Sequence, residues 1–421
     1  MSGVDVVVTG QGVVSPLGVG AAPLIDGLWS NTIAIGEAPW VTTRDDNPFA
    51  WWAVVHDFEP RDWMDEKVEA GTDLFAQFAL AATVEAVADA GLETLDPLRT
   101  AVVHGTSIGG ARALLKAQHQ YETGGPGTVE RKTMIQIFPN MAAAQIAMRW
   151  GLHGPQLTVC TACASSLDAV GLARTLIRSG QVDVALVGGT EGGFPLASGE
   201  ADGDFVPAMY IGQASYGMTT GERDPARASL PFDVHRSGIV TGDGSAALVL
   251  ESAEHAHARG ARVLVEVAGF ATLADGHHPS SPSPDGEWEA RAMRLALDDA
   301  GVAPGEVSAL IAHATATPKG DAAEIKAING VYEGRATPLP VTSIKGHTGH
   351  TGASSGAMGI VAAGHAMRHG SFPNVAGTKD VDPAVEFDVV VGEPAALDVD
   401  VVQVNAFGFG GQDTSVVVRR P

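Results

Sequence analysis

Cysteine is scarce in this chain: there are only two in 421 residues. Such scarcity excludes a disulfide framework and is typical of proteins that stay in a reducing compartment. Long apolar runs are missing too, so the sequence predicts no membrane span, and no basic segment leads into an apolar run as in a secretory signal. We therefore expect a cytoplasmic protein that does not bind membranes.

Positive charge is also in short supply. Lysine and arginine number 26 against 49 acidic residues, which leaves a formal net charge of -23. A field of this sign repels phosphate backbones, so a nucleic-acid partner is not expected. An acidic protein partner would need a local basic patch on this chain.

Aromatic residues make up only 6% of the chain, so aliphatic side chains must fill the core. Apolar runs rich in β-branched residues alternate with helical stretches, which is typical of α/β layers. We expect the first strand, at residues 6–8, to be broken by the glycines at positions 10 and 12. Further strands are expected at 100–104, 156–160, 182–187 and 246–250, and helices at 72–90 and 163–177.

The second part of the chain repeats this order. A strand is expected at 263–267, a helix at 287–300, and strands at 309–313, 341–344, 401–404 and 415–418. We therefore predict two similar halves, 1–252 and 253–421. Because no Ser/Pro-rich linker separates them, they should share one core.

Cys160 and Cys163 are separated by two residues, and this spacing has several interpretations. A redox pair usually lies near the start of a small domain, whereas this pair is in mid-chain. A zinc-stabilised scaffold would need two further ligands, for which His347 and His350 are candidates. Alternatively, Cys160 is a buried strand residue and Cys163 a nucleophile at the start of a helix, where the helix dipole lowers the thiol pKa. An inert buried cysteine is the generic alternative.

Two of the 14 histidines lie at turns that match the position of Cys163. His313 ends an apolar strand and enters a run of small and hydroxyl residues, and His350 follows a tight loop that leads into a helix. Ligands gather at the carboxyl ends of strands in α/β sheets, so these three residues can converge on one pocket. The glycine-rich turn at 405–411 could add backbone N–H groups.

The ordered set of motifs resembles the β-ketoacyl-acyl-carrier-protein synthases of the thiolase-like superfamily, and most of all the elongating type II enzymes of fatty acid and polyketide pathways. The matching segments lie at 8–18, 161–166, 231–233, 242–244, 313–324, 345–350 and 408–411.

The resemblance implies a five-layered αβαβα fold built from two pseudo-symmetric halves. It implies that Cys163 accepts an acyl chain from an acyl carrier protein and that a malonyl carrier protein then loses carbon dioxide. The enolate would attack the thioester while His313 and His350 donate hydrogen bonds to its oxygen. No metal and no cofactor of the enzyme's own is implied, because the carrier protein bears the phosphopantetheine arm.

Further residues match family positions. Lys345 and Glu324 match an ion pair near the histidines, and Phe409 matches a gating aromatic whose backbone N–H, with that of Cys163, forms an oxyanion hole. The residues expected to bind pantetheine or substrate are Thr315, Thr317, Ser280 and Ile108, of which Ile108 would line an acyl tunnel. The residues expected to dock the carrier protein are Arg131, Lys132 and Lys67.

Departures from the family pattern at Ser237, Ala314 and 346–347 indicate a specialised polyketide or fatty acid pathway, and the alternative is a housekeeping fatty acid elongation synthase II. The chain is expected to form a homodimer, or a heterodimer with a chain-length factor. A non-condensing partner subunit would lack Cys163. An acyltransferase or thioesterase that works without decarboxylation would be favoured if the histidines lay far from Cys163.

Overall fold

The computed structural model describes residues 4–38, 51–192 and 208–421. Twelve of its strands form one mixed sheet with two arms. The first arm contains β1 (Val6–Ser15), β8 (Gly244–Ser252), β7 (Val184–Glu191), β5 (Thr100–Gly105) and β6 (Gln156–Val159), and the short β2 (Gly18–Val19) pairs with β1. The second arm contains β9 (Val265–Ala274), β16 (Gln412–Arg419), β15 (Val401–Gly408), β10 (Ala309–Ile311), β11 (Pro340–Thr342) and β13 (Asp388–Val389).

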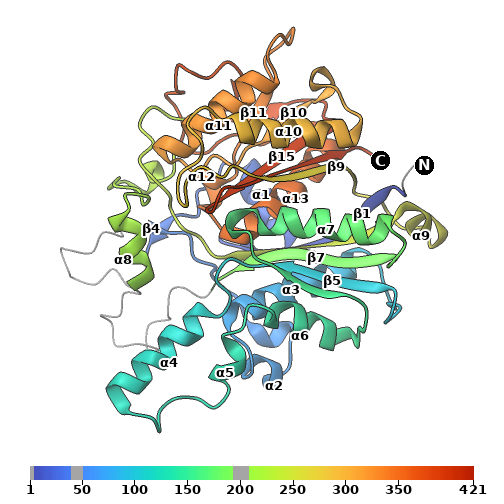
Figure 1. The fold of residues 1–421 in the computed structure, drawn as a ribbon, viewed down its shortest axis with the longest axis vertical. Helices are drawn as coiled ribbons and strands as arrows, with labels where there is room; N and C mark the ends of the chain where they lie inside the picture. Colours follow the sequence, from blue (N-terminus) through green and yellow to red (C-terminus); the bar gives the residue numbers. More distant parts are fainter. Residues whose placement is uncertain (1–3, 39–50, 193–207) are drawn as a thin grey trace.

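The arms meet through only two residue pairs between β1 and β9, where Val7 faces Glu266 and Val8 faces Val265. Helices cover both outer faces and fill the space between the arms (Figure 1). The outer layers are α3 (Leu74–Asp89) with α6 (Met141–Trp150), and α10 (Glu287–Ala300) with α11 (Pro318–Val331). The central layer holds α7 (Ser165–Arg178) and α13 (Ser355–His369). The expected five-layered αβαβα architecture is confirmed.

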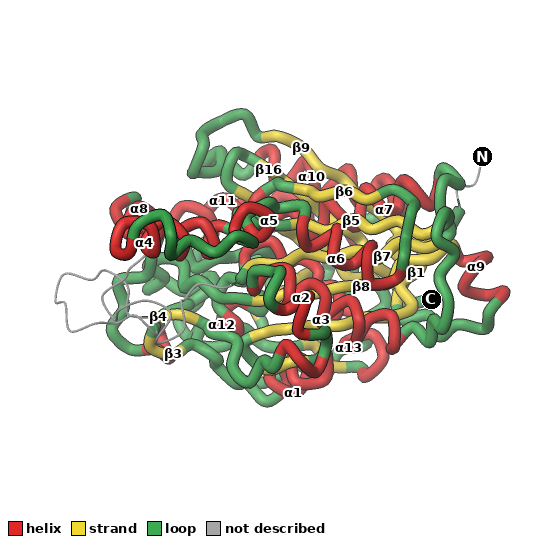
Figure 2. The backbone as a smooth tube through the Cα atoms, turned by 90° about the horizontal axis from the view of Figure 1, so that it is seen from below, coloured by secondary structure: helices red, strands yellow, loops and turns green. Residues whose placement is uncertain are grey.

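The remaining helices and strands mostly belong to the segments that connect these layers (Figure 2). They are α1 (Ala21–Trp29), α2 (Glu66–Glu69), α4 (Ala111–Gly124), α5 (Thr133–Gln136), α8 (Ala208–Ser215), α9 (Ala253–Ala258), α12 (Lys345–Thr348), β3 (Gly36–Glu37), β4 (Trp51–Trp52), β12 (Ser371–Phe372) and β14 (Ala395–Ala396). Across the described ranges, no helix combines the length and apolar character that crossing a bilayer requires. The division into halves at residue 252, where β8 ends and α9 begins, stays a prediction.

The expectation that glycines break the first strand is wrong, because β1 continues through them to Ser15. These glycines serve close packing instead. A Cβ at Gly10 would lie 2.1 Å from the carbonyl oxygen of Ala86 in α3, and one at Gly12 would lie 2.0 Å from that of Ala82. Gly269 of β9 approaches α10 in the same way, since its Cβ would lie 2.1 Å from the carbonyl oxygen of Ala296. In both arms, therefore, glycine lets an outer helix lie directly on its strand.

Candidate active site

Cys163, His313 and His350 meet at the carboxyl ends of strands, as the topology predicts. Cys163 lies in a single 3-10 turn, Ala162–Ala164, between β6 and α7. His313 follows β10, and His350 lies between α12 and α13. The Nε2 atom of His350 is 2.9 Å from the Cys163 sulfur, and the two imidazole rings meet edge to face with their centroids 5.4 Å apart.

The backbone around Cys163 is held in an uncommon conformation. Ala162 has a φ of 49°, in the left-handed region that residues with a Cβ rarely adopt. Gly408 allows the neighbouring turn to approach, because a Cβ there would lie 2.7 Å from the carbonyl oxygen of Thr161. The backbone N–H groups of Cys163 and Phe409 both act on the Cys163 sulfur and lower the pKa of its thiol. The same two donors can stabilise an oxyanion formed beside that sulfur.

The expected depression of the thiol pKa is wrong. Burial raises the pKa of Cys163 to about 11, while the charge of Lys345 and the two N–H groups oppose the shift without cancelling it. A thiol removed from water loses the hydration that favours its thiolate, and here that loss outweighs the helix start. Cys163 therefore rests as a neutral thiol, and its activation requires a base in contact with the sulfur.

His350 can serve as that base. Burial, together with the charge of Lys345, holds the pKa of His350 well below its usual range, so the imidazole is neutral. Its Nδ1 lies 3.2 Å from the hydroxyl oxygen of Ser355. When Nδ1 donates to that hydroxyl, the lone pair of Nε2 faces the thiol and can accept its proton.

His313 is also neutral, because burial and the charge of Lys345 keep its pKa well below the usual range, and a proton on the neighbouring His350 would lower it further. Lys345 and Glu324 make no direct ion pair, which corrects the expectation for these two described residues. Instead, the Lys345 ammonium donates to the carbonyl oxygen of His313, and Glu324 accepts the N–H groups of His313 at 2.9 Å and of Ala314 at 2.6 Å. The two charges thus fix the backbone of His313 from both sides.

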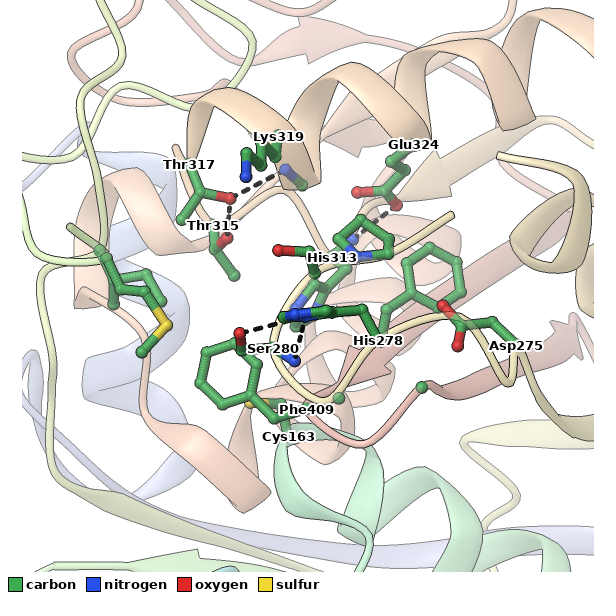
Figure 3. Close-up of a pocket in the computed structure, with 18 of the residues that line it drawn as sticks. Cys163, Asp275, His278, Ser280, His313, Thr315, Thr317, Lys319, Glu324 and Phe409 are labelled. Atoms are coloured by element: carbon green, nitrogen blue, oxygen red, sulfur yellow. Dashed lines mark hydrogen bonds between the residues drawn. The ribbon is translucent and has the colours of Figure 1, made fainter. Parts of the chain in front are cut away.

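Cys163, His313, Glu324 and His350 border a cavity of about 410 Å³ (Figure 3). The hydroxyls of Thr315 and Thr317 lie 3.2 Å apart in its wall, and Ser280 lies nearby with its hydroxyl 3.4 Å from Nδ1 of His278. Phe409 also borders the cavity and is 43% exposed. The cavity therefore offers a reactive sulfur at one point and several hydroxyls along its wall.

Some predicted residues lie elsewhere. Ile108 is not in the cavity wall and packs instead in a small cluster with Trp52, so its expected place in the tunnel is not seen here. Arg131 and Lys132, just before α5, and Lys67 in α2 are exposed, and none of them lines the cavity. Lys319, at the start of α11, lines the cavity. It was not among the residues predicted to bind substrate, although it lies two residues from Thr317.

The zinc scaffold does not fit this geometry. His347 is buried, and its two ring nitrogens each lie 2.9 Å from a backbone carbonyl oxygen, those of Thr32 and Asn374, so neither is available to a metal. Cys160 is exposed instead of buried, and its sulfur contacts the carbonyl oxygen of Ser107. The four proposed ligands therefore do not share one site.

The reactivity of the thiol should follow its raised pKa. Below about pH 11 the thiolate fraction grows with pH, so alkylation of Cys163 by iodoacetamide should accelerate about tenfold for each pH unit between pH 6 and pH 9. Intact-mass spectrometry of the Cys160→Ala variant, in which Cys163 is the one remaining cysteine, measures this rate. A rate that is already constant between pH 6 and pH 8 would show a stable thiolate and contradict the raised pKa.

The layered fold, with its thiol and two imidazoles, defines a thiolase-like condensing enzyme. The sequence matches the family model "Beta-ketoacyl synthase, N-terminal domain" over residues 4–256 and "Beta-ketoacyl synthase, C-terminal domain" over residues 264–379. The chain belongs to the β-ketoacyl synthase family.

Individual relatives agree with this assignment. The chain is 34% identical to the 3-oxoacyl-(acyl-carrier-protein) synthase 2 of Synechocystis sp. and 33% identical to that of Coxiella burnetii, in each case over 99% of this chain and 98% of the relative. Among solved structures it is similar to the ishigamide ketosynthase/chain length factor, with a TM-score of 0.90, 31% identity and full coverage of both chains. A type II PKS ketosynthase solved with its acyl carrier protein has a TM-score of 0.89, 27% identity and the same coverage.

Proposed function

We propose that this enzyme transfers an acyl chain from an acyl carrier protein to Cys163 and extends it by two carbons through decarboxylative condensation with a malonyl carrier protein. The contact of 2.9 Å between His350 Nε2 and the Cys163 sulfur, with the His313 ring beside it, is the observation that carries the proposal. The named activity of its relatives supports the same chemistry.

In the first half-reaction His350 accepts the thiol proton as the sulfur of Cys163 attacks the thioester carbonyl. The carbonyl oxygen becomes an oxyanion, which the N–H groups of Cys163 and Phe409 stabilise. When the tetrahedral intermediate collapses, the pantetheine sulfur leaves and takes up the proton. The acyl chain remains on Cys163, and His350 is neutral again.

In the second half-reaction the malonyl thioester loses carbon dioxide, and the electron pair of the broken bond forms an enolate. Neutral imidazoles at His313 and His350 donate hydrogen bonds to the enolate oxygen without protonating its carbon. For this step His350 is the tautomer that carries its proton on Nε2, with Nδ1 accepting from the Ser355 hydroxyl. The carbon attacks the acyl-Cys163 carbonyl, and collapse of the intermediate releases the β-ketoacyl product on the carrier. The Cys163 thiolate that leaves takes up a proton from solvent, which restores the neutral thiol.

Other residues of the cavity hold the substrate or the catalytic groups. The hydroxyls of Thr315, Thr317 and Ser280 are placed to bond the amides of the pantetheine arm. Phe409, between glycines, gates the cavity. Lys345 and Glu324 act as positioning residues, since both bond the backbone of His313.

Two alternatives lose support from the geometry. A non-condensing partner subunit has no use for a thiol in contact with a base, and an acyltransferase without decarboxylation was expected to have its histidines far from Cys163. We favour a specialised polyketide or fatty acid pathway over housekeeping elongation because of the departures at Ser237, Ala314 and 346–347. Assembly as a homodimer or with a chain-length factor belongs to the proposal. A cytoplasmic location does too, because both thiols are free and Cys163 must stay reduced.

One experiment tests the proposed function directly. The purified full chain, with any partner subunit required, is incubated first with an acyl carrier protein carrying a hexanoyl chain and then with malonyl carrier protein. We expect the intact mass to rise by one hexanoyl group at Cys163, and carbon dioxide and a β-ketoacyl carrier to follow. Acylation with no condensation would limit the activity to acyl transfer, and no acylation by any chain length would refute the proposal.

Carrier docking gives a second prediction. An acidic carrier would be attracted by the exposed cations Arg131 and Lys132, so Arg131→Glu with Lys132→Glu should raise KM for the carrier substrate about tenfold or more, with little change in kcat. Lys67→Glu tests the third predicted cation separately. The matched control is Arg291→Glu with Lys379→Glu, which changes the net charge equally at two other exposed cations.

The same variants should process a free acyl-pantetheine thioester at the wild-type rate, because that substrate has no carrier to dock. If KM for the carrier stays unchanged, or rises equally in the control pair, these cations are not the docking patch.

A further inference from the structure

Two carboxyl groups in the cavity wall take no part in the chemistry above. Glu289 is the third residue of α10, and Asp413 lies in β16, where it pairs with Phe407 of β15. Both line the cavity that contains Cys163, and they are 3% and 2% exposed. Oε2 of Glu289 and Oδ2 of Asp413 are buried and have no hydrogen-bond partner.

The other acidic groups of this wall have their partners. Glu324 accepts the backbone N–H groups of His313 and Ala314, and Asp275 accepts those of His277 and Ser283. Glu289 and Asp413 therefore differ from their neighbours, because no group in the described part of the chain forms a hydrogen bond with Oε2 of Glu289 or Oδ2 of Asp413. A buried carboxylate without a partner is costly, so each of these groups must either stay protonated or gain a partner from outside.

The nearby charges add to this effect. Burial raises the pKa of Glu289 well above its usual range, and the negative charges of Glu324, Asp413, Asp275 and Asp321 raise it further. Burial, with the charges of Asp275 and Glu324, raises the pKa of Asp413 to about 7. Of the lysines in the described chain, Lys319 alone lines the cavity, and it lies across from Asp275 in Figure 3. The charges that act most strongly on Glu289 and Asp413 are all negative.

We propose that Glu289 and Asp413 form an anionic subsite of the cavity that binds a cation. The cation comes from one of two sources: the ammonium group of an amino-substituted acyl substrate, or an inorganic cation with oxygen ligands such as Mg²⁺, Ca²⁺ or K⁺. The first source, which rests on the proposed function, would make this synthase selective for acyl chains with a basic group. The second would make it a synthase that takes up a metal ion beside its substrate.

The ammonium source is tested with acyl-pantetheine thioesters of four, six and eight carbons, each with and without a terminal amino group. The rate of Cys163 acylation is followed by intact mass in the wild type, in Glu289→Gln and in Asp413→Asn. For at least one length we expect the amino-substituted chain to react about tenfold or more faster, as a charged hydrogen bond predicts, and this preference to disappear in both variants. Glu287→Gln is the matched control, because Glu287 is exposed in the same helical turn and carries the same charge.

The inorganic source is tested by thermal unfolding of the same proteins with MgCl₂, CaCl₂ or KCl. A cation that occupies the subsite raises Tm of the wild type and of Glu287→Gln but not of Glu289→Gln or Asp413→Asn. The proposal is overturned if no amino-substituted chain is preferred and no cation gives this difference, since the carboxyls are then simply protonated. Acylation by the unsubstituted chains reports the proposed function separately, so the two ideas can fail independently.

Discussion

Replacing Cys163 by alanine is expected to abolish acylation and condensation, with a loss of at least about 10⁴-fold in turnover. The substitution removes the one nucleophile that contacts His350 and leaves the two N–H donors without a thioester to stabilise. Its effect on folding should be small, because the side chain loses a single sulfur atom in a turn that borders a cavity. The measurement is intact mass after incubation with acyl carrier protein, together with assay of the β-ketoacyl product.

Cys160→Ala is the matched control, since it removes the other cysteine, three residues away, whose sulfur is exposed. That variant should acylate at close to the wild-type rate. Acyl label on the Cys163→Ala protein, or loss of label from Cys160→Ala, would place the nucleophile elsewhere.

Residues whose position follows from the order of strands could be predicted from the sequence. Cys163 follows β6 of the first arm, whereas His313 and His350 follow β10 and β11 of the second, and in each arm ligands gather at the carboxyl ends of such strands. The outer helix α10 was predicted with its observed bounds, because its periodicity and the Ala-Gly that ends it are local signals. Topology and local pattern together thus locate the reactive groups without coordinates.

Properties that depend on the surrounding protein could not be predicted in this way. A helix start favours thiolate, but the sequence does not show that burial around Cys163 outweighs it. Lys345 and Glu324 read as an ion pair, yet each finds a better partner in the backbone of His313, because buried carbonyl and N–H groups must be satisfied. Glu287 and Glu289 are both acidic residues in the first turn of α10, and only packing against β16 separates the buried Glu289 from the exposed Glu287. The glycines of β1 were wrongly predicted to end the strand for the same reason, because they allow close packing against α3, which the local sequence does not show.

The two histidines should separate the half-reactions. His313→Ala removes one donor to the enolate oxygen and should slow malonyl decarboxylation by about 10²–10³-fold. Acylation of Cys163 should fall far less, because the base in contact with the sulfur is His350. Carbon dioxide release from malonyl carrier protein and the rate of acylation, measured on the same preparation, give the two values.

His350→Ala should impair both reactions, because the same ring accepts the thiol proton and donates to the enolate. With Cys163 at a pKa of about 11, little thiolate exists at pH 7 without this base, so raising the pH to 9 should partly restore acylation but not decarboxylation. His369→Ala, an exposed histidine in α13, is the control and should change neither rate. If His313→Ala instead slowed acylation as much as decarboxylation, the division of labour drawn from the contact between His350 and Cys163 would be wrong, and the two imidazoles would have to act as one unit in both steps.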